Sequence, residues 1–388
     1  MAPDGIPSWV GRLPLQDRSR LEEAVNFLRN ITPEDKVGIL YDDDGDGLSA
    51  AASVIIGVIR LRGNAPEWVQ PFGHSSSFID DALVRRIKGA GLTKLISVDR
   101  SIEQKPTSFL QEMESVCPIL VIDHHKVYNE YSSPRFIVLK PQIVWETESS
   151  SFPTAILAHT LFSMVVDMRD KDWIPCIGIT SDSAYASWKS FVDASAKKWG
   201  LNPVKDDPFA APFGIMSSII YCTQILSSYQ LSELLGIITN ASHPNELLNS
   251  GFRSLVSVIE DEINEWMDRA ERELEKEEKI ELILSSVRPK HAIKSLLINK
   301  LSRKYPHYTV IMLQDVANGT RVTLSARRQD FRIPVNDLLE KSIAGLSDAN
   351  AGGHIPSAGG SIRKEDESLF LANLRKYLTA FYAKEKSS

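Results

Sequence analysis

A run of aspartates constrains this chain more than any other feature of its sequence. Asp42, Asp43, Asp44 and Asp46 lie within five residues, directly after the apolar segment 37–41, and the helix-length segment 48–61 follows them. Ionised carboxylates this close together repel one another, so a bound cation is their natural partner. An acidic turn at a helix N-terminus accounts for one or two of these residues, but poorly for four.

An EF-hand calcium loop is the first alternative for this segment. Asp42, Asp44, Asp46 and Gly47 match the beginning of the D-x-D-x-D-G pattern of such a loop. The twelfth position of the loop is Ser53 instead of Glu, and an apolar strand-like segment precedes it instead of a helix. The sequence therefore argues against an EF-hand.

Strand-like and helix-like segments alternate through the N-terminal half of the chain. The expected strands are residues 37–41, 68–72, 94–98 and 119–122, and the expected helices are residues 15–28, 48–61, 80–88 and 109–114. This alternation predicts βαβ units and a parallel sheet. Helical spacing of apolar residues dominates from Pro153 to Asn240, which completes an α/β domain.

Two more of the expected strands end in residues that can bind metal. Asp99 follows the strand 94–98, and Asp123, His124 and His125 follow the strand 119–122. Because the carboxyl ends of parallel strands meet at one edge of a sheet, these side chains can converge with the first aspartates. A mixed carboxylate and imidazole set suits Mn²⁺, and Mg²⁺ is the second choice. One bridging carboxylate would make this a two-metal site.

Basic residues gather in the C-terminal part of the chain. The net charge is -6 overall, but residues 281–388 contain 17 Lys and Arg against 10 Asp and Glu, a net charge of +7. Such an excess indicates an anionic partner for this part. We predict a metal-binding α/β domain at 1–245, a charged amphipathic connector helix at 246–280, and a smaller α/β domain at 281–388 across a cleft.

Composition narrows the class of protein further. The sequence is 43% hydrophobic and 24% charged, which is ordinary for a globular protein and excludes disordered or collagen-like classes. We find neither an apolar run of membrane-spanning length nor a signal-peptide pattern. The three cysteines are far apart in sequence, so no disulfide framework is indicated. We expect a soluble, cytoplasmic protein with no membrane association.

Five motifs follow one another along the chain: residues 44–47 (DGDG), Asp99, residues 123–125 (DHH), residues 178–182 (GITSD) and residues 352–359 (GGHIPSAG). In this order they resemble those of the DHH phosphoesterase superfamily, and the chain is most similar to its compact archaeal RecJ-like exonucleases. The first four resemble motifs of the metal-binding domain of that family. The fifth, which we expect to form a glycine-rich loop, resembles the G-G-H-x-x-A-A-G signature of its associated substrate-binding domain.

The resemblance implies a two-domain hydrolase of phosphodiester bonds that uses two Mn²⁺ or Mg²⁺ ions. Carried over residue by residue, it implies one ion on Asp44 and Asp99, and a second on Asp46, Asp99, His124 and Asp182. It further implies that His125 faces the scissile phosphate and that Asp123 orients its neighbours. Many members carry a histidine four residues before the first motif aspartate. That position is Leu40 here, and Asp42 is the nearest substitute ligand.

The resemblance also implies single-stranded DNA or RNA as the substrate, cleaved from an end, and a replication or helicase protein as a partner. Phosphate contacts are expected from Gly352, Gly353, His354 and Gly359, with Arg327 or Arg328 beside them and His74 at the first sheet. Two alternatives stay open. One is an enzyme for short oligonucleotides or cyclic dinucleotides, and the other is a catalytically silent replication or repair scaffold.

Overall fold

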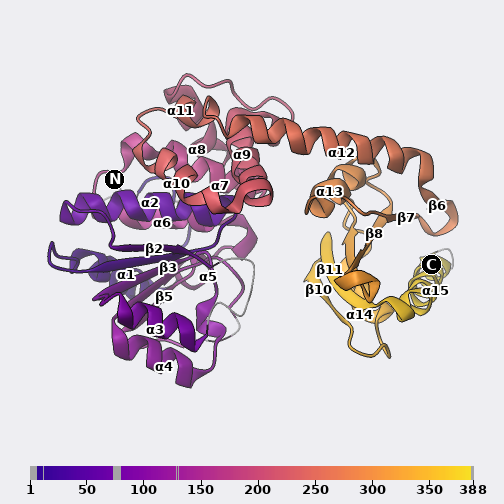
Figure 1. The fold of residues 1–388 in the computed structure, drawn as a ribbon, viewed down its shortest axis with the longest axis horizontal. Coiled ribbons are helices and arrows are strands. Elements are labelled where there is room, and N and C mark those ends of the chain that lie inside the picture. The colour runs from indigo at the N-terminus through magenta and orange to yellow at the C-terminus, as the bar shows by residue number, and fades with distance from the viewer. Residues whose placement is uncertain (1–6, 12, 73–79, 128, 130, 386–388) are drawn as a thin grey trace. The chain divides into compact units, whose positions relative to one another are not determined.

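The computed structural model describes residues 7–11, 13–72, 80–127, 129 and 131–385 (Figure 1). The chain divides into two compact units, the first ending at Val256 and the second beginning at Ser257. Within the described ranges, no helix combines the length and the apolar character that crossing a lipid bilayer requires.

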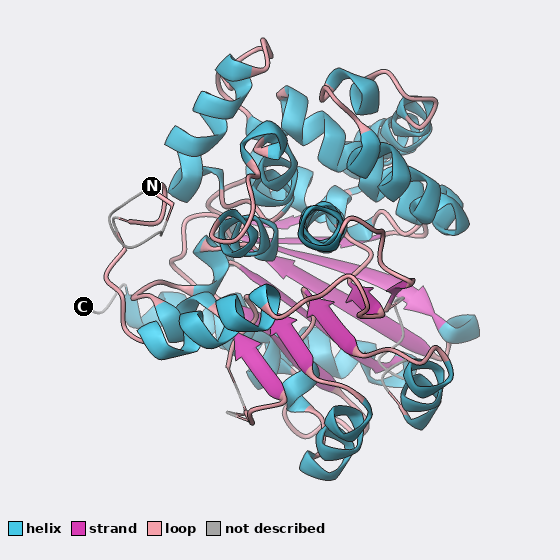
Figure 2. Ribbon diagram, turned by 90° about the vertical axis from the view of Figure 1, so that its left-hand side faces the viewer, coloured by secondary structure: helices cyan, strands magenta, loops and turns pink. Residues whose placement is uncertain are grey.

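A five-stranded, all-parallel sheet forms the centre of the first unit, as the alternation of segments predicts (Figure 2). Its spatial order is β2-β1-β3-β4-β5. The strands are β1 (Val37–Tyr41), β2 (Trp68–Pro71), β3 (Lys94–Val98), β4 (Ile119–Ile122) and β5 (Phe136–Leu139). Four of them were expected from the sequence. The fifth, β5, was not predicted, because the alternation of strand and helix stops after β4: none of the described residues between β4 and β5 is helical.

Helices cover both faces of this sheet (Figure 1). On one face, α3 (Asp81–Gly89) and α4 (Thr107–Val116) pack onto apolar residues such as Leu40, Leu95 and Val121. On the other face, α2 (Gly45–Arg62) packs against α6 (Thr154–Ser163) and α7 (Trp173–Ser181). Because both faces are covered, the inner strands β1 and β4 are buried along their whole length.

The strand order places a topological switch between β1 and β3. The chain runs from β1 outward to β2, then returns across β1 to β3, and it continues through β4 to β5. Connections on either side of such a point leave in opposite directions and open a crevice at the carboxyl edge of the sheet. The aspartate run after β1 and Asp99 after β3 therefore lie at the carboxyl ends of the two strands on either side of this switch point.

The remaining helices of the first unit are α1 (Arg18–Arg29), α5 (Pro141–Val144), α8 (Tyr185–Lys198), α9 (Pro212–Ser227), α10 (Leu231–Asn240) and α11 (Asn245–Leu248). Helix α1 lies where the sequence predicts a helix over 15–28, and α8, α9 and α10 lie within the mainly helical stretch 153–240. A long helix, α12 (Arg253–Glu273), follows. The single helix expected over 246–280 is thus shorter, because the chain breaks at residues 249–252 and leaves the helix after Glu273 to enter the second sheet.

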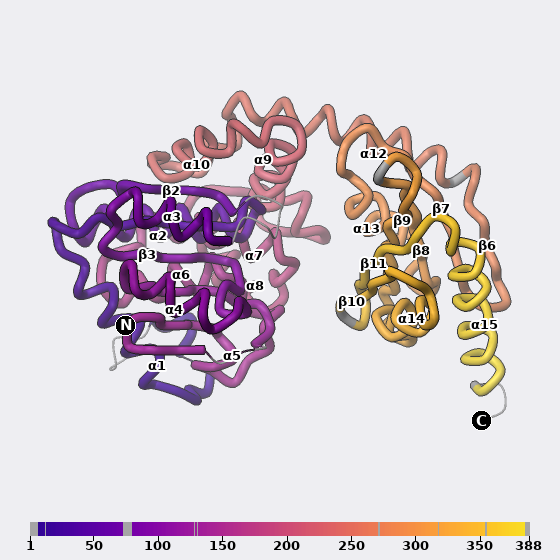
Figure 3. The backbone as a smooth tube through the Cα atoms, turned by 60° about the horizontal axis from the view of Figure 1, so that its bottom comes forward, coloured from indigo at the N-terminus to yellow at the C-terminus, as the bar shows by residue number. Residues whose placement is uncertain are grey.

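A six-stranded mixed sheet forms the centre of the second unit, in the order β10-β11-β9-β8-β7-β6. Figure 3 shows β10 and β6 at its two ends. The strands are β6 (Glu275–Glu277), β7 (Leu282–Ser286), β8 (Thr309–Val316), β9 (Arg321–Arg327), β10 (Asn350–His354) and β11 (Ser357–Arg363). One face carries α13 (Lys294–Lys304), and an apolar core under α14 (Val335–Ser342) and α15 (Glu367–Glu385) fills the other.

The glycine-rich signature forms a β-hairpin and not the loop that we expected. β10 and β11 pair antiparallel, with Gly352 opposite Gly359 and Gly353 opposite Ala358. Gly353 has a φ of +142°, and a Cβ there would lie 2.5 Å from the Ser357 carbonyl oxygen. A side chain at this position would therefore be strained and would separate the two strands. The glycines keep the hairpin flat and its backbone accessible.

Arg328, a residue expected to contact substrate, is instead part of the interior of the second unit. Its side chain is fully buried, and its Nη2 lies 2.6 Å from Glu281 Oε2 while its Nε lies 2.7 Å from Asp330 Oδ1. Thr309 and Tyr382 accept further hydrogen bonds from it. With its donors used inside the protein, Arg328 is not available to a ligand.

Replacing Arg328 by Met should destabilise the protein by about 3 kcal/mol, because the change leaves Glu281 and Asp330 without their buried cation. The matched control is Arg363→Met, whose ion pairs are exposed and should contribute less than about 1 kcal/mol. Urea denaturation followed by circular dichroism measures both. Equal midpoints for the two variants would contradict a structural role for Arg328.

Candidate active site

Four segments bring acidic and imidazole groups together at the carboxyl edge of the first sheet. Asp46 lies in the first turn of α2, Asp99 follows β3, His124 follows β4, and Asp182 caps the C-terminus of α7. His124 Nε2 is 3.2 Å from Asp182 Oδ2, 3.6 Å from Asp99 Oδ1 and 3.9 Å from Asp46 Oδ2. These four side chains match the set that the sequence motifs predict for one metal ion.

The hydrogen bond of His124 prepares it to bind metal. Its Nδ1 lies 3.0 Å from the carbonyl oxygen of Ser149. A carbonyl can only accept, so Nδ1 carries a proton, and in the neutral ring Nε2 presents a lone pair toward the carboxylates. Such an outer hydrogen bond, which fixes the tautomer and orientation of a histidine, is typical of metal-ligating imidazoles.

The carboxylates of this cluster are held in a place that disfavours their charge. Asp46 is fully buried, and its burial, with the charges of Asp182 and Asp44, raises its pKa well above the usual range. Burial and the charges of neighbouring aspartates likewise raise the pKa of Asp99. Burial raises the pKa of Asp182 to about 6, although His124 opposes the shift. A cation among these groups would favour their charged forms, so the donor set fits a divalent ion.

The N-terminus of α6 orients two of the buried carboxylates. The backbone N–H groups of Thr154 and Ala155 donate to Asp46 over 2.7 and 2.9 Å, and the Thr154 hydroxyl donates to Asp99 over 2.8 Å. A helix N-terminus offers unpaired N–H groups and a positive dipole, which suits an anion. Thr154 was not predicted from the sequence, although Ser, Thr or Pro at a helix start is a recognisable signal.

Two glycines give the cluster its room. A Cβ at Gly178 would lie 2.4 Å from Asp46 Oδ1, and one at Gly47 would lie 2.2 Å from the Asp42 carbonyl oxygen. Neither position can hold a larger residue without moving the aspartates. The glycines of the first and fourth motifs therefore make space for the carboxylates.

Asp44 and Asp42 lie outside the groups of three described side chains whose ligand atoms are close enough to share one ion. Asp44 caps α2, where its Oδ1 accepts from the N–H groups of Asp46 and Gly47. Asp42 Oδ2 lies 3.0 Å from Arg100 Nη1, and its Oδ1 accepts from the Asp43 N–H. Both oxygens of Asp42 are thus engaged, and Leu40 is buried in the core on the face covered by α3 and α4.

A second group of possible ligands shares Asp99 and His124 and adds His125. The His125 ring is half exposed, and its Nδ1 lies 2.7 Å from Asp123 Oδ1 and 3.9 Å from Asp99 Oδ1. The hydrogen bond with Asp123 raises the pKa of His125. Asp123 is fully buried, and its pKa is lowered because His125 and Lys140 outweigh the burial.

Three residues behind Asp123 escaped the sequence analysis. Lys140 follows β5, Glu103 lies in the turn after β3, and Ser101 precedes it; Lys140 Nζ contacts both carboxylates and the serine hydroxyl. The signal was present, because Phe136–Leu139 is a fully apolar run that precedes a charged residue, as β1, β3 and β4 do. The run does not follow a helix-like segment, so the alternation of strands and helices did not indicate it.

The second unit places two cations on the polar face of its sheet, beside the glycine hairpin. Arg327 Nε donates to Asn299 over 2.8 Å, and Lys294 Nζ donates to the Thr323 hydroxyl over 2.7 Å. Burial and the charge of Arg327 lower the pKa of Lys294 to about 8. The described ion pairs give neither cation an acidic partner.

Two predicted substrate contacts cannot be placed. His74 lies outside the described residues, and for His354 only the backbone, which ends β10, is described.

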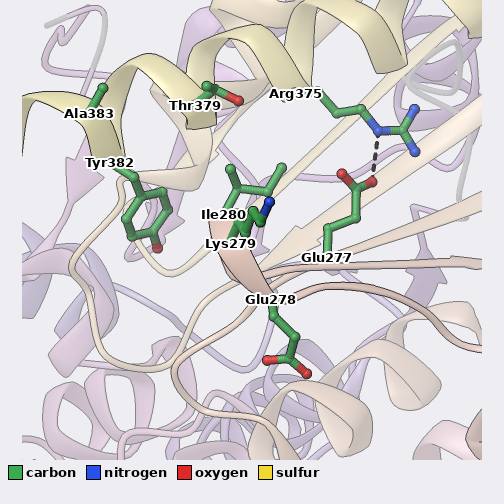
Figure 4. Close-up of a pocket in the computed structure, with 8 residues that line it drawn as sticks. All are labelled: Glu277, Glu278, Lys279, Ile280, Arg375, Thr379, Tyr382 and Ala383. Atoms are coloured by element: carbon green, nitrogen blue, oxygen red, sulfur yellow. Dashed lines mark hydrogen bonds and ion pairs between the residues drawn. The ribbon is translucent and has the colours of Figure 1, made fainter.

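A cavity of about 780 Å³ lies elsewhere in the second unit, between the β6 region and α15 (Figure 4). Glu277 and Arg375 are among its lining residues and form an ion pair of 2.7 Å, and the hydroxyl of Tyr382 is bonded to Glu281. Ile280 contributes an apolar surface to the same wall. None of the described residues that line it is an aspartate or a histidine, so it does not resemble the cluster of the first unit.

Comparison with solved structures identifies the fold. RecJ from Thermus thermophilus in complex with Mn²⁺ superposes with a TM-score of 0.68 at 17% identity, over 97% of this chain and 56% of that one. A second exonuclease RecJ bound to manganese gives 0.63 at 16% identity, over 96% and 95% of the two chains. The DHH domain of a member of a family of ribosomal proteins gives 0.70 at 16% identity, over 97% and 95%.

The chain has a RecJ-like DHH fold. This confirms the fold class predicted from the motifs, with the parallel sheet and the second mixed-sheet unit. The chain spans just over half the length of the Thermus RecJ. No family model matches the sequence, and a search of curated proteins found no match.

Mn²⁺ should raise the melting temperature of the protein, because a ligand that binds only the folded state stabilises it by about 2.7 kcal/mol at a hundred times its Kd. Asp46→Asn should abolish this rise while leaving the metal-free protein at least as stable, since it removes a buried, repelled charge. The control is Asp42→Asn, outside the cluster, which should keep the rise. Differential scanning calorimetry with Mn²⁺ or EDTA measures each. An unchanged Mn²⁺ response in Asp46→Asn would contradict the assignment.

The metal-free protein should lose stability through Asp182 as the pH rises from about 4 to about 6. The unfolded carboxyl loses its proton near pH 4, whereas the folded one keeps it to about pH 6, so in this window the folded state binds more protons. Asp182→Asn should therefore flatten the decline relative to the parent protein. Melting temperatures at pH 4.5 and 6.5 in EDTA test this, and parallel curves for the two proteins would exclude it.

Proposed function

We propose that this protein is a divalent-metal-dependent phosphodiesterase, a RecJ-like exonuclease that hydrolyses single-stranded DNA or RNA from an end. The observation that carries the proposal is the convergence of Asp46, Asp99, His124 and Asp182, with His124 Nε2 within 3.9 Å of all three carboxylates. Two structures of similar fold bear the name RecJ and hold Mn²⁺. Their likeness to this chain concerns the fold, so the activity is our inference from the site.

The donor set of the cluster supports two Mn²⁺ or Mg²⁺ ions. Asp46, His124 and Asp182 would hold one ion, and Asp99, which belongs with His124 and His125 to the second group of possible ligands, would bridge to a second ion beside Asp44. When bound, two such ions supply a hydroxide nucleophile and stabilise the charge of a phosphoryl group during displacement. Asp42 is not a ligand in this proposal, because its two oxygens are engaged by Arg100 and by the Asp43 N–H.

The residues of this chain have separate tasks around that centre. His125, half exposed and bonded to Asp123, would contact the scissile phosphate or donate a proton to the leaving oxygen. Asp123 holds the ring by its Nδ1, which leaves Nε2 to face the substrate. Thr154 and Ala155 keep the buried carboxylates oriented before any ligand arrives.

Lys294 and Arg327 support an anionic substrate for the second unit. Half-buried cations without acidic partners are costly, and a phosphate would relieve the cost. They lie on the face of β9 that also presents Thr323 and continues to Gly359 of the hairpin. We propose that 1–245 is the catalytic domain, 246–280 the connector, and 281–388 the substrate-binding domain, with Gly352, Gly353 and Gly359 letting a phosphate approach the backbone.

Degradation of labelled strands tests the proposed activity. Single strands labelled at the 5' or the 3' end, as DNA and as RNA and at several lengths, should shorten with Mn²⁺ and remain intact with EDTA. Asp99→Asn should lower the rate more than about 100-fold, because it removes the carboxylate proposed to bridge the two ions. Asp42→Asn is the matched carboxylate control.

The pattern of products separates the alternatives. Cleavage confined to strands of a few nucleotides would favour the enzyme of short oligonucleotides or cyclic dinucleotides, and strand binding without hydrolysis would favour the silent scaffold. A replication or helicase protein remains a proposed partner.

Lys294→Met and Arg327→Met should each raise KM about 10- to 100-fold with little change in kcat, because each removes a charge-assisted hydrogen bond to substrate. Lys341→Met is the control, since Lys341 lies on α14 at the opposite face of the sheet. Steady-state kinetics with a 5'-labelled and a 3'-labelled strand measures both constants. A KM that stays at the parent value in both variants would exclude this face as the substrate site.

A further inference from the structure

A lysine is fully buried behind the DHH motif. Lys140 directly follows β5, and its side chain has no exposed surface. Its Nζ lies 2.6 Å from Asp123 Oδ2, 2.9 Å from Glu103 Oε1 and 3.1 Å from the Ser101 hydroxyl, and it donates to the His125 carbonyl over 2.8 Å. One ammonium group thereby joins the segments that follow β3, β4 and β5.

The charges around Lys140 do not cancel within the group. Asp123 and Glu103 are both fully buried, so two carboxylates face one ammonium. An apolar residue of similar size often stabilises a fold as well as a buried ion pair does. Stability alone therefore gives a weak reason for this arrangement, and the contacts of Asp123 offer a better one.

The two oxygens of Asp123 are divided between two sets of partners. Oδ2 accepts from Lys140 and from Ser101, at 2.6 and 2.7 Å, and Oδ1 is left to His125, at 2.7 Å. With Oδ2 fixed by two donors, the carboxylate cannot rotate away from the His125 ring. Lys140 and Ser101 therefore fix the direction in which Asp123 Oδ1 faces the His125 ring.

The backbone of His125 is held from the same side. Its carbonyl oxygen accepts from Lys140 Nζ and from Gln142 Nε2, both over 2.8 Å. Lys140 thus fixes His125 twice, at the main chain directly and at the ring through Asp123. The ring itself is half exposed, so its orientation depends on these bonds.

We propose that Lys140 is a positioning residue, which acts through Asp123 and the His125 carbonyl to hold the His125 ring in the orientation that the reaction needs. The inference rests on the proposed function for its kinetic consequences, but the orientation of the ring can be measured without any reaction. Outer residues of this kind typically contribute about 10- to 100-fold to activity.

Lys140→Met, which approximates the length of the side chain and removes its charge, tests the proposal. We expect kcat to fall about 10- to 100-fold, with KM and the Mn²⁺ affinity from calorimetry within about 3-fold of the parent values. In metal-free protein labelled with ¹⁵N-histidine, the Nδ1 signal of His125, assigned with His125→Gln, should shift. That signal reports the bond to Asp123 and does not depend on catalysis.

The matched control is Lys171→Met. Lys171 is also a buried lysine of the first unit, but its Nζ donates to the carbonyl oxygens of Ala241 and Thr239. The Lys171→Met variant should have a lower melting temperature, with the His125 signal and kcat unchanged. Should Lys140→Met fail to fold, Lys140→Met with Glu103→Gln removes one charge of each sign and is expected to fold with the same loss of kcat.

The outcomes distinguish the two hypotheses. A parent protein that hydrolyses no phosphodiester would overturn the proposed function, and the His125 signal would still test the positioning. An unshifted signal, or a kcat equal to that of Lys171→Met, would overturn the role of Lys140.

Discussion

The arrangement of the first unit depends on the repulsion among carboxylates that the sheet brings to one edge. Burial and the charges of neighbouring aspartates raise the pKa of Asp46, Asp99 and Asp182, so the charged form of each carboxyl is disfavoured. Fixed hydrogen-bond donors partly offset this cost. The N-terminus of α6 donates to Asp46, and the Thr154 hydroxyl donates to Asp99. These donors orient the carboxylates but leave a charge deficit that suits a cation.

At the same edge of the sheet, the surroundings of Asp123 favour its charged form. The pKa of Asp123 is lowered, although it is as deeply buried as Asp46, because Lys140 and His125 flank it. Burial is thus equal and charge environment decides the outcome. Carboxylates at one sheet edge thereby differ in their charge environment. Asp46, Asp99 and Asp182 lie mainly among other carboxylates, whereas Asp123 is paired with the ammonium group of Lys140.

The second unit shows the complementary pattern with positive charge. Two arginines adjacent in sequence differ completely, because successive residues of an extended chain point to opposite faces. Arg327 faces the side with hydroxyls and glycines and has neutral hydrogen-bond partners, whereas Arg328 turns inward to Glu281 and Asp330. The inward arginine is paired with two carboxylates of the unit, and the outward one has no acidic partner among the described ion pairs.

The sequence by itself determined the parallel sheet and most of its strands. Strand ends that share an edge predicted that Asp44, Asp46, Asp99, His124 and His125 converge, whereas the family resemblance of the motifs was needed to add Asp182. The signals it used were local: apolar runs, glycine spacing and motif order. Tertiary structure alone decided what depends on contacts between distant segments. These contacts include Lys140 behind Asp123, Thr154 under the carboxylates, and the pairing of Asp42 with Arg100. The glycine-rich run, expected to form a loop, is a hairpin in the structure. Its strand β11 also pairs with β9, which is distant in the chain. Partners so far apart in sequence leave no local periodicity, and their geometry is fixed only when the sheets form.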